Sequence, residues 1–417
     1  MSVNSRKVLR LILMAILCVA ALTLTGCGSQ ALVESSSYKT EYLPEEDYNY
    51  LSYSWWDESQ RMAQSDRGIY FLAGYYLFFM DWDTRQTVPL CFKPDCLHAD
   101  ETDQEKVVFC DAFIGGGAVQ TPFLAYYRDK IYTICIDRTT GEDNLVEMNP
   151  DGSDRKILCS VSDSETLLLS QIFMHRGVIY FFSNLKDLNG EAHYGLNALS
   201  VVSDSHEPVQ VYTGSFEGGW VQDFFAFENY IFFADCYETD TSFDRKTIMY
   251  DIRTGESEVI LGGGNAIYGL EDNNLLIRQD GLYYVYSLKD KTLTPSGRNY
   301  DTFLQAHPQW QCHCENPDED FAMFSYYDLE TDNIIYDSYV INSQGEVAAI
   351  IPDVAWSNGC IYDMDGEKYV FRYVYNNSAI RAYAKKDLLQ GIINPIIVFD
   401  ADNYNDLIPA YLTKTGN

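Results

Sequence analysis

The stretch Gln222–Leu261 contains the pattern that recurs along most of this chain, and it reads QDFFAFENYIFFADCYETDTSFDRKTIMYDIRTGESEVIL. Glu228-Asn229 precedes the apolar run Tyr230–Ala234, and the turn residues Arg253–Glu256 precede a last short run. Runs of four to eight β-branched and aromatic residues that end at Asn, Asp or Gly are signals of strands and hairpins. The stretch contains four such runs, so it predicts one antiparallel sheet of four short strands.

Similar units follow one another along the chain. Their most apolar runs begin near positions 68, 130, 178, 230, 274, 321 and 368, which are 44 to 62 residues apart. A repeat of about 40 to 50 residues with four strands in each is the sequence signature of a β-propeller. One such sheet cannot bury both of its faces, whereas a ring gives every sheet a neighbour on either side. The sequence therefore predicts an all-β fold, a seven-bladed β-propeller of four-stranded antiparallel blades.

The first 26 residues have the composition of a targeting segment. Arg6, Lys7 and Arg10 precede the twelve apolar residues Leu11–Leu22, which are fewer than the about 20 needed to span a bilayer. The following Leu24-Thr25-Gly26-Cys27 closely resembles the lipobox of bacterial lipoproteins. This resemblance implies that Cys27 carries diacylglycerol and becomes the mature N-terminus. An ordinary signal peptide and an uncleaved anchor are the alternatives.

The domain organisation follows from these two interpretations. Residues 1–26 are expected to be the lipoprotein signal peptide, 27–37 a tether, and 38–412 the β-propeller with a cysteine-containing insertion at 91–121. The alternating segment Tyr38–Leu43 is predicted to close the ring as the outer strand beyond Ile396–Phe399. The expected location is the cell membrane, with the protein anchored by its lipid and facing outward.

Acidic residues outnumber basic ones by about two to one. The chain has 61 Asp and Glu against 29 Lys and Arg, a formal net charge of -32. Removal of the signal peptide takes away three positive charges and gives -35. Such a surface repels nucleic acid and attracts cations or basic partners. Solubility alone is another explanation of the charge, but a nucleic-acid partner is excluded.

Two turns resemble those of a known class of propellers. The segment Met148–Ser153, followed by Lys156–Leu158, looks like the Asp-Gly turn and apolar strand of TolB-like and YWTD-like propellers, and Tyr250–Glu256 is similar. Over residues 60–400 the chain resembles bacterial lipoproteins that contain such propellers. The resemblance implies the fold and the export of the protein. It implies no activity, because propellers occur in proteins of unrelated function.

The insertion contains a group of metal-ligating residues, Cys91, Cys96, His98 and Cys110. Three thiolates and one imidazole are a sufficient ligand set for tetrahedral zinc, the only cofactor that the sequence indicates. Exported proteins, however, normally form disulfides. A Cys96–Cys110 bridge would close a loop of about 15 residues, which is worth roughly 3 kcal/mol. A disulfide, a metal site and free thiols all remain open.

A second thiol cluster, Cys312, His313 and Cys314, is predicted to lie in the loop before the sixth unit. Adjacent thiols of this kind bind soft metals. They would also suit a bridge to the first cluster or a purely local role. His175 and His193 are predicted to lie at the surface.

The sequence contains no nucleophile elbow, no HExxH motif and no Ser/His/Asp grouping, so no catalytic residue is assigned. The predicted function is that of a membrane-anchored extracytoplasmic binding or scaffolding lipoprotein. Its propeller rim, dominated by the loop 92–121, would bind a protein or a carbohydrate. One alternative is a propeller hydrolase or lyase that acts on polysaccharide or peptide with residues gathered at the central tunnel. The other is a metal-handling lipoprotein that uses the first cysteine cluster.

Overall fold

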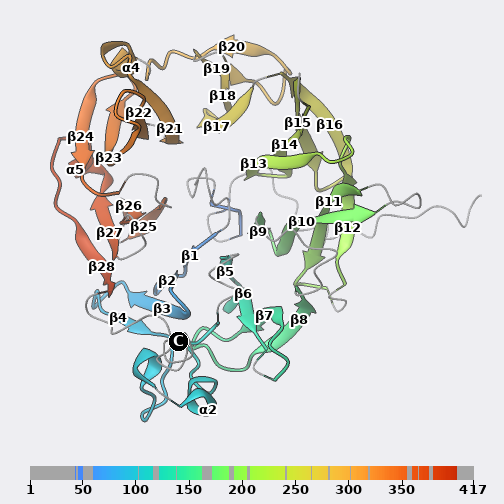
Figure 1. The fold of residues 1–417 in the computed structure, drawn as a ribbon, viewed down its shortest axis with the longest axis vertical. Helices are drawn as coiled ribbons and strands as arrows, with labels where there is room; N and C mark the ends of the chain where they lie inside the picture. The colour runs from blue at the N-terminus through green and yellow to red at the C-terminus, as the bar shows by residue number, and fades with distance from the viewer. Residues whose placement is uncertain are drawn as a thin grey trace, which may run out of the picture.

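The computed structural model describes residues 43, 46–49 and 60–401, except 102, 116–121, 138, 162–170, 187–191, 204–206, 240–241, 264, 280–281, 301, 318–319, 355–358, 365 and 375–378. The predicted signal peptide, tether and lipidation site at Cys27 lie outside these residues. In this part of the chain, seven four-stranded antiparallel sheets stand side by side in a ring (Figure 1). None of the helices within it is long and apolar enough to cross a membrane.

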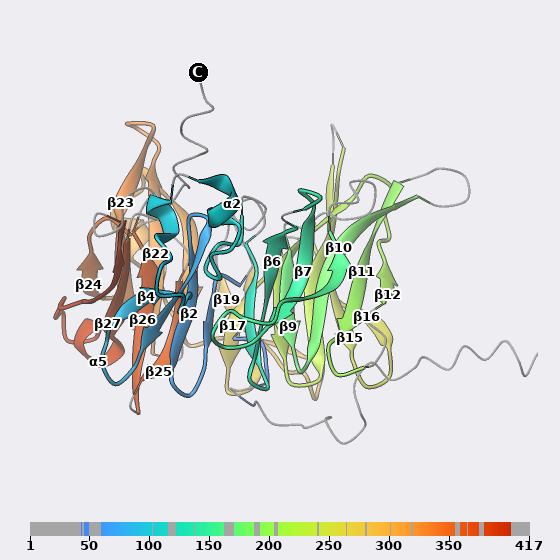
Figure 2. The same ribbon diagram turned by 90° about the horizontal axis from the view of Figure 1, so that it is seen from below.

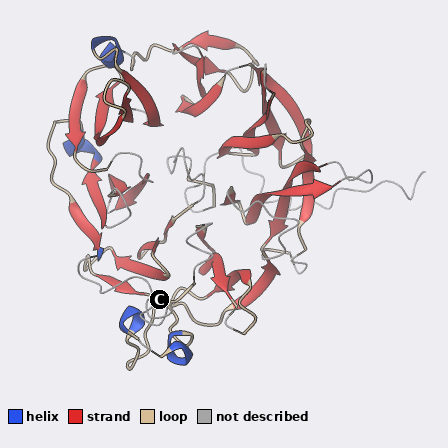
Figure 3. Cartoon of the chain, viewed as in Figure 1, coloured by secondary structure: helices blue, strands red, loops and turns tan. Residues whose placement is uncertain are grey.

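The strands of each sheet are consecutive in the chain. The first sheet contains β1 (Met62–Gln64), β2 (Gly68–Ala73), β3 (Tyr76–Asp81) and β4 (Thr87–Pro89). The second sheet contains β5 (Leu124–Tyr127), β6 (Lys130–Ile136), β7 (Asp143–Met148) and β8 (Lys156–Ser160). The third sheet contains β9 (Ile172–His175), β10 (Val178–Lys186), β11 (Ala192–Ser200) and β12 (Val209–Thr213), and the fourth contains β13 (Trp220–Phe227), β14 (Tyr230–Glu238), β15 (Phe243–Asp251) and β16 (Glu256–Gly262). The fifth sheet contains β17 (Ala266–Glu271), β18 (Asn274–Gln279), β19 (Leu282–Tyr286) and β20 (Leu293–Pro295). The sixth sheet contains β21 (Trp310–Pro317), β22 (Phe321–Asp328), β23 (Asn333–Asn342) and β24 (Val347–Ile351). The seventh sheet contains β25 (Gly359–Met364), β26 (Glu367–Tyr373), β27 (Ala379–Ala384) and β28 (Ile396–Asp400). Short helices η2 (His98–Asp100), α2 (Gln104–Val107), α4 (Thr302–Ala306) and α5 (Lys385–Leu388) lie in the connections (Figure 3).

The prediction of a seven-bladed propeller is confirmed. The second strands of the seven sheets begin at residues 68, 130, 178, 230, 274, 321 and 367, within one residue of the predicted positions. All six residues of β2 are buried, as are most of those in β14. A strand with sheets packed on both of its faces reads as a continuous apolar run, which is why the repeat was visible in the sequence.

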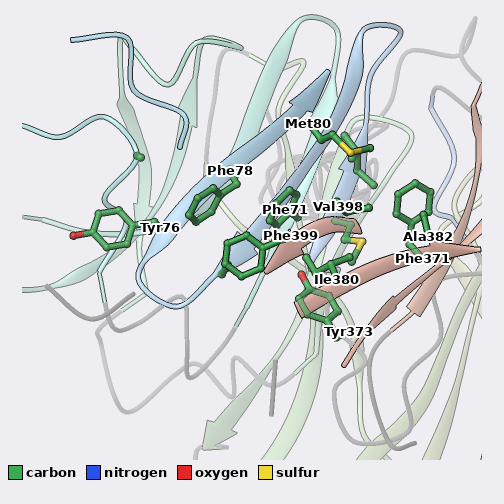
Figure 4. Packing of buried hydrophobic residues seen from close by; sticks show 14 of the residues in the cluster. Phe71, Tyr76, Phe78, Met80, Phe371, Tyr373, Ile380, Ala382, Val398 and Phe399 are labelled. Carbon is green, nitrogen blue, oxygen red and sulfur yellow. The ribbon is translucent and has the colours of Figure 1, made fainter. Parts of the chain in front are cut away.

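Seven hydrophobic clusters hold the ring together, and each one joins two neighbouring sheets. The cluster in Figure 4 joins the last sheet to the first and so closes the ring. In it the ring of Phe399 lies 5.0 Å from that of Phe78 and 5.7 Å from that of Phe71. Burial of each such side chain stabilises the fold by roughly 1.5–3 kcal/mol.

The predicted closing strand falls almost wholly outside the described residues, since only Leu43 of Tyr38–Leu43 is described. In the sheet where it was expected to pair, the order is β25-β26-β27-β28. Four consecutive strands therefore complete this sheet, and the packing around Phe399 joins it to the first sheet.

The prediction that Cys312, His313 and Cys314 lie in a loop is wrong, because they lie in β21. Cys312 pairs with Tyr326 and Cys314 pairs with Ser325, with a register shift between them. This irregularity has the form of a β-bulge, which leaves one residue out of the ladder. The neighbouring Pro317 indicated a loop, but proline is tolerated on a strand at the edge of a sheet.

Candidate metal centre

The cysteine-containing insertion connects β4 to β5, and its helix α2 projects at one face of the ring (Figure 2). We call its residues 91–115 the rim insertion. Its last part is tied to the first sheet by backbone hydrogen bonds: the Leu77 N–H donates to the Ala112 carbonyl at 2.8 Å, and the Ile114 N–H donates to the Tyr75 carbonyl at 2.9 Å. Arg155 donates from Nη1 to the Phe113 carbonyl at 2.9 Å. These contacts fix the position of the residues that follow Cys110.

The structure brings together Cys91, Cys96, His98 and Cys110. One ligand atom from each lies within 4.8 Å of all the others. The Nδ1 atom of His98 is 3.4 Å from the Cys110 sulfur. Cys91 and Cys110 are buried, whereas Cys96 and His98 are half-buried. The four side chains therefore form one compact group at the base of the rim insertion.

Tight turns place these ligands. The Cys96 N–H donates to the Lys93 carbonyl at 3.2 Å, and the Cys110 N–H donates to the Val107 carbonyl at 3.0 Å. His98 has a backbone φ of 51°, a left-handed conformation that costs a residue with a side chain about 1–2 kcal/mol. Such conformations persist where the surrounding structure requires them, and they gather at functional sites.

Burial of the cysteine group disfavours the charged thiolate forms, whereas nearby backbone N–H groups favour them. Burial raises the pKa of Cys96 and of Cys110, and the neighbouring thiols raise that of Cys110 further. Burial lowers the pKa of His98. In opposition, the backbone N–H of His98 acts to lower the pKa of Cys96, and that of Ala112 acts to lower the pKa of Cys110. Burial thus favours the neutral forms of Cys96, His98 and Cys110, and the two backbone N–H groups would help to stabilise thiolates at Cys96 and Cys110 if a cation were bound.

The other described cysteine side chains lie in strands of the sheets. Cys135, Cys236 and Cys360 are buried, and Cys159 is half-buried. Cys360 contacts the sulfur of Met62 at 3.3 Å within the cluster that closes the ring. These residues act as small apolar residues in the core. The side chains of Cys312, His313 and Cys314 lie outside the described residues, so the second thiol cluster stays a prediction.

A second group of polar residues, which the sequence did not indicate, lies near the axis of the ring. The side chains of Asp47 and Arg176 form an ion pair in which both are fully buried. Arg176 also donates from Nη1 to Asn229 at 2.8 Å, and its backbone N–H donates to the Glu46 carbonyl at 2.6 Å. The segment Glu46–Asn49 is thereby fixed to the turns of the third and fourth sheets.

The prediction that His175 lies at the surface is wrong, because this residue is fully buried beside the same segment. Its Nδ1 accepts a hydrogen bond from the Tyr48 N–H at 2.9 Å, so Nε2 carries the proton and donates to the Glu228 carbonyl at 2.7 Å. Burial lowers its pKa to about 4. A neutral imidazole thus satisfies two backbone groups that would otherwise be buried without partners.

Little space remains beside this segment. A cavity of about 60 Å³ lies between Glu46–Asn49 and the inner strands β1 and β5, whereas ligand pockets usually measure about 300–1,000 Å³. Asn49 continues to the last sheet, where its Nδ2 donates to the Ile361 carbonyl at 3.1 Å. The chain itself therefore occupies this part of the axis.

Comparisons with known proteins support the fold alone. No protein-family model matches the sequence, and no curated protein matches it either. Solved structures similar to this one include a prolyl endopeptidase with a TM-score of 0.52, 8% identity, and coverage of 84% of this chain and 51% of that chain. An acylaminoacyl peptidase from Pyrococcus horikoshii has a TM-score of 0.45 at 7% identity, with 86% and 54% covered. The β-propeller domain of the Trilobed protease from Pyrococcus furiosus has a TM-score of 0.45 at 7% identity, with 84% and 98% covered.

The present chain spans about half the length of the two peptidases in this comparison, 51% of one and 54% of the other. At identities this low, structural similarity says nothing about chemistry. The comparisons therefore identify the ring of sheets as a β-propeller related in shape to peptidase propeller domains.

Proposed function

We propose that this protein is a membrane-anchored extracytoplasmic binding lipoprotein that captures a basic protein partner on its rim insertion. The observation that carries the proposal is the exposure of three large apolar side chains within 18 residues. Phe92, Leu97 and Phe109 are 67%, 58% and 66% exposed. Exposed apolar groups gathered on one feature mark interaction sites, and buried aromatic anchors supply much of the affinity of protein interfaces.

The cysteine group connects the three residues that carry these side chains. Phe92 follows Cys91, Leu97 follows Cys96, and Phe109 precedes Cys110. The three sulfurs lie within 4.8 Å of one another, and neighbouring Cα atoms along a chain are about 3.8 Å apart. Each of the three apolar residues is therefore joined by one peptide bond to a member of the converging group.

Charge supports a basic partner. Between residues 91 and 115 the sequence has six acidic residues and two lysines, on a chain whose net charge is -32. Opposite charge on a partner would accelerate its association and orient it, and the apolar anchors would hold it once it is bound. The lipobox at Cys27 supports attachment to the membrane. The similarity to peptidase propellers concerns the fold alone, so we do not propose a hydrolase.

Cross-linking in native membranes tests this function. A photoreactive amino acid in place of Phe92 or Phe109 is expected to label a basic protein, whereas the same group in place of Phe243 is expected to label none. Phe243 is the matched control, because it is 50% exposed but lies in β15, outside the rim insertion. Labelling of a second copy of this chain, labelling only of polysaccharide, or equal labelling from all three positions would overturn the proposal.

The affinity for the captured protein gives a quantitative prediction. Phe109→Ala is expected to raise the Kd of the complex with the captured protein about tenfold or more, because removal of an interface anchor costs about 1.4 kcal/mol or more of binding free energy. Phe243→Ala should leave the Kd unchanged. Isothermal titration calorimetry at two salt concentrations measures the Kd of both variants, and binding should weaken at the higher salt concentration. A Kd that is insensitive to Phe109 would place the partner elsewhere.

A further inference from the structure

We propose that Cys91, Cys96, His98 and Cys110 bind one zinc ion in a closed, structural site that fastens the rim insertion to the propeller. This proposal depends on the ligand geometry and not on the proposed function, because a zinc site would exist whether or not the insertion captures a partner. Four donors from the protein fill a tetrahedral shell and leave no position for a substrate. The site would therefore stabilise structure and not perform catalysis.

The distances fit such a shell. Zinc–sulfur bonds of about 2.3 Å and a zinc–nitrogen bond of about 2.1 Å place tetrahedral sulfurs about 3.8 Å apart, and sulfur and nitrogen about 3.6 Å apart. The His98 nitrogen is 3.4 Å from the Cys110 sulfur, and all four donors lie within 4.8 Å of one another. Shifts of less than about 1 Å for each donor would complete the shell. No rearrangement of the backbone is needed to bring the ligands together.

The donor types select the metal. Calcium and magnesium prefer oxygen ligands, whereas thiolates and imidazole in tetrahedral arrangement suit zinc.

A disulfide explains less of the geometry than a zinc ion does. A Cys96–Cys110 bridge would use two of the four converging side chains and would give neither Cys91 nor His98 a function.

The surroundings of the sulfurs match those of bound thiolates. In two cases the backbone N–H of the residue two positions further on acts to lower the pKa of the thiol: that of His98 for Cys96 and that of Ala112 for Cys110. Outer hydrogen bonds of this kind orient the ligands of a metal and hold charge on them. The two backbone N–H groups lie in separate turns of the insertion, so one local conformation does not account for both.

A zinc ion would also add an attachment for residues 92–109, in addition to the contacts made by the last part of the insertion. Cys91 and Cys110 belong to the cluster that closes the ring, and Val107 is fully buried in it. By contrast, Phe92, Leu97 and Phe109 are exposed and add no core. A structural zinc site supplies folding free energy to segments with too little core of their own. Zinc would join the half-buried Cys96 and His98 to the two cysteines already held in the core.

Metal analysis of the purified full-length protein tests the proposal. One equivalent of zinc per chain is expected, and Cys96→Ser and His98→Asn should each reduce it at least tenfold. Cys159→Ser is the matched control, because Cys159 is half-buried in β8 and outside the group; it should retain zinc fully. Cobalt in place of zinc should give the absorption of a tetrahedral thiolate complex, and this should be lost in the same two variants.

Three results would overturn the proposal. One is protein that lacks zinc and, after unfolding without reductant, has two thiols fewer than the reduced protein, which would indicate a disulfide. Another is protein without metal whose thiols are all free. The third is stoichiometric copper or iron, which would replace zinc as the native ion.

The fastening of the rim insertion is tested by limited proteolysis. A zinc chelator should accelerate cleavage within residues 92–109 at least tenfold in the wild type and leave the near-UV circular dichroism of the ring unchanged. Equal cleavage with and without chelator would rule out that role.

Discussion

Arg176→Met is expected to lower the free energy of unfolding by about 3–5 kcal/mol, as measured by urea denaturation. Arg176 and Asp47 are both fully buried, and Asp47 accepts from both Nε and Nη2 of the guanidinium, at 3.0 Å from Nη2. Removal of the arginine would leave the carboxylate buried without a compensating charge, and the loss of one partner from a buried pair has a cost of this size. The same variant leaves Asn229 without its donor at 2.8 Å.

Two further variants separate burial from charge. Arg253→Met is the surface control, because Arg253 is 38% exposed and its partner Asp251, at 2.7 Å, is 16% exposed. A pair of this kind contributes at most about 1 kcal/mol. The double variant Asp47→Leu/Arg176→Met should recover most of the lost stability, since apolar replacement of a whole buried pair is often neutral. A loss below about 1 kcal/mol for Arg176→Met would show that Glu46–Asn49 is not fixed as the structure describes.

Acidification from pH 6.5 to pH 4 is expected to remove roughly 3 kcal/mol of stability through His175 alone. The pKa of His175 is lowered to about 4 in the folded protein, chiefly by burial, whereas it is about 6.5 in an unfolded chain. Between these values the unfolded state binds more protons than the folded state, so stability rises with pH. The contribution is complete above pH 6.5 and is lost as the pH falls through this window.

The His175→Asn variant isolates this effect. Its side-chain amide takes up no proton in this pH range, so the fall in stability between pH 6.5 and 4 should be about 3 kcal/mol smaller than in the wild type. His307→Asn, at a half-buried position next to β21, is the control histidine outside this segment. Urea denaturation at a series of pH values measures all three proteins. Equal slopes for wild type and His175→Asn would mean that the imidazole is not buried as a neutral group.

The sequence alone determined the ring of sheets and the candidate ligand set. Each blade is specified by local signals, because buried middle strands such as Tyr230–Ala234 are apolar throughout and the turns between them require Asn, Asp or Gly. The predicted strand starts therefore agree with the structure to within one residue. Cys91, Cys96, His98 and Cys110 could also be found, because they lie within 20 residues of one another and their spacing is visible without a fold.

Only the tertiary structure decided what depends on distant parts of the chain. Asp47 and Arg176 are 129 positions apart, and no local pattern indicates that they meet near the axis or that His175 is buried beside them. The same holds for Cys312–Cys314, which belong to a strand because β22 offers a partner edge and not because their own sequence favours one. Backbone pairing and burial are properties of the assembled ring. A strand's apolar run and a turn's glycine are properties of the segment itself, and so they can be recognised before the ring exists.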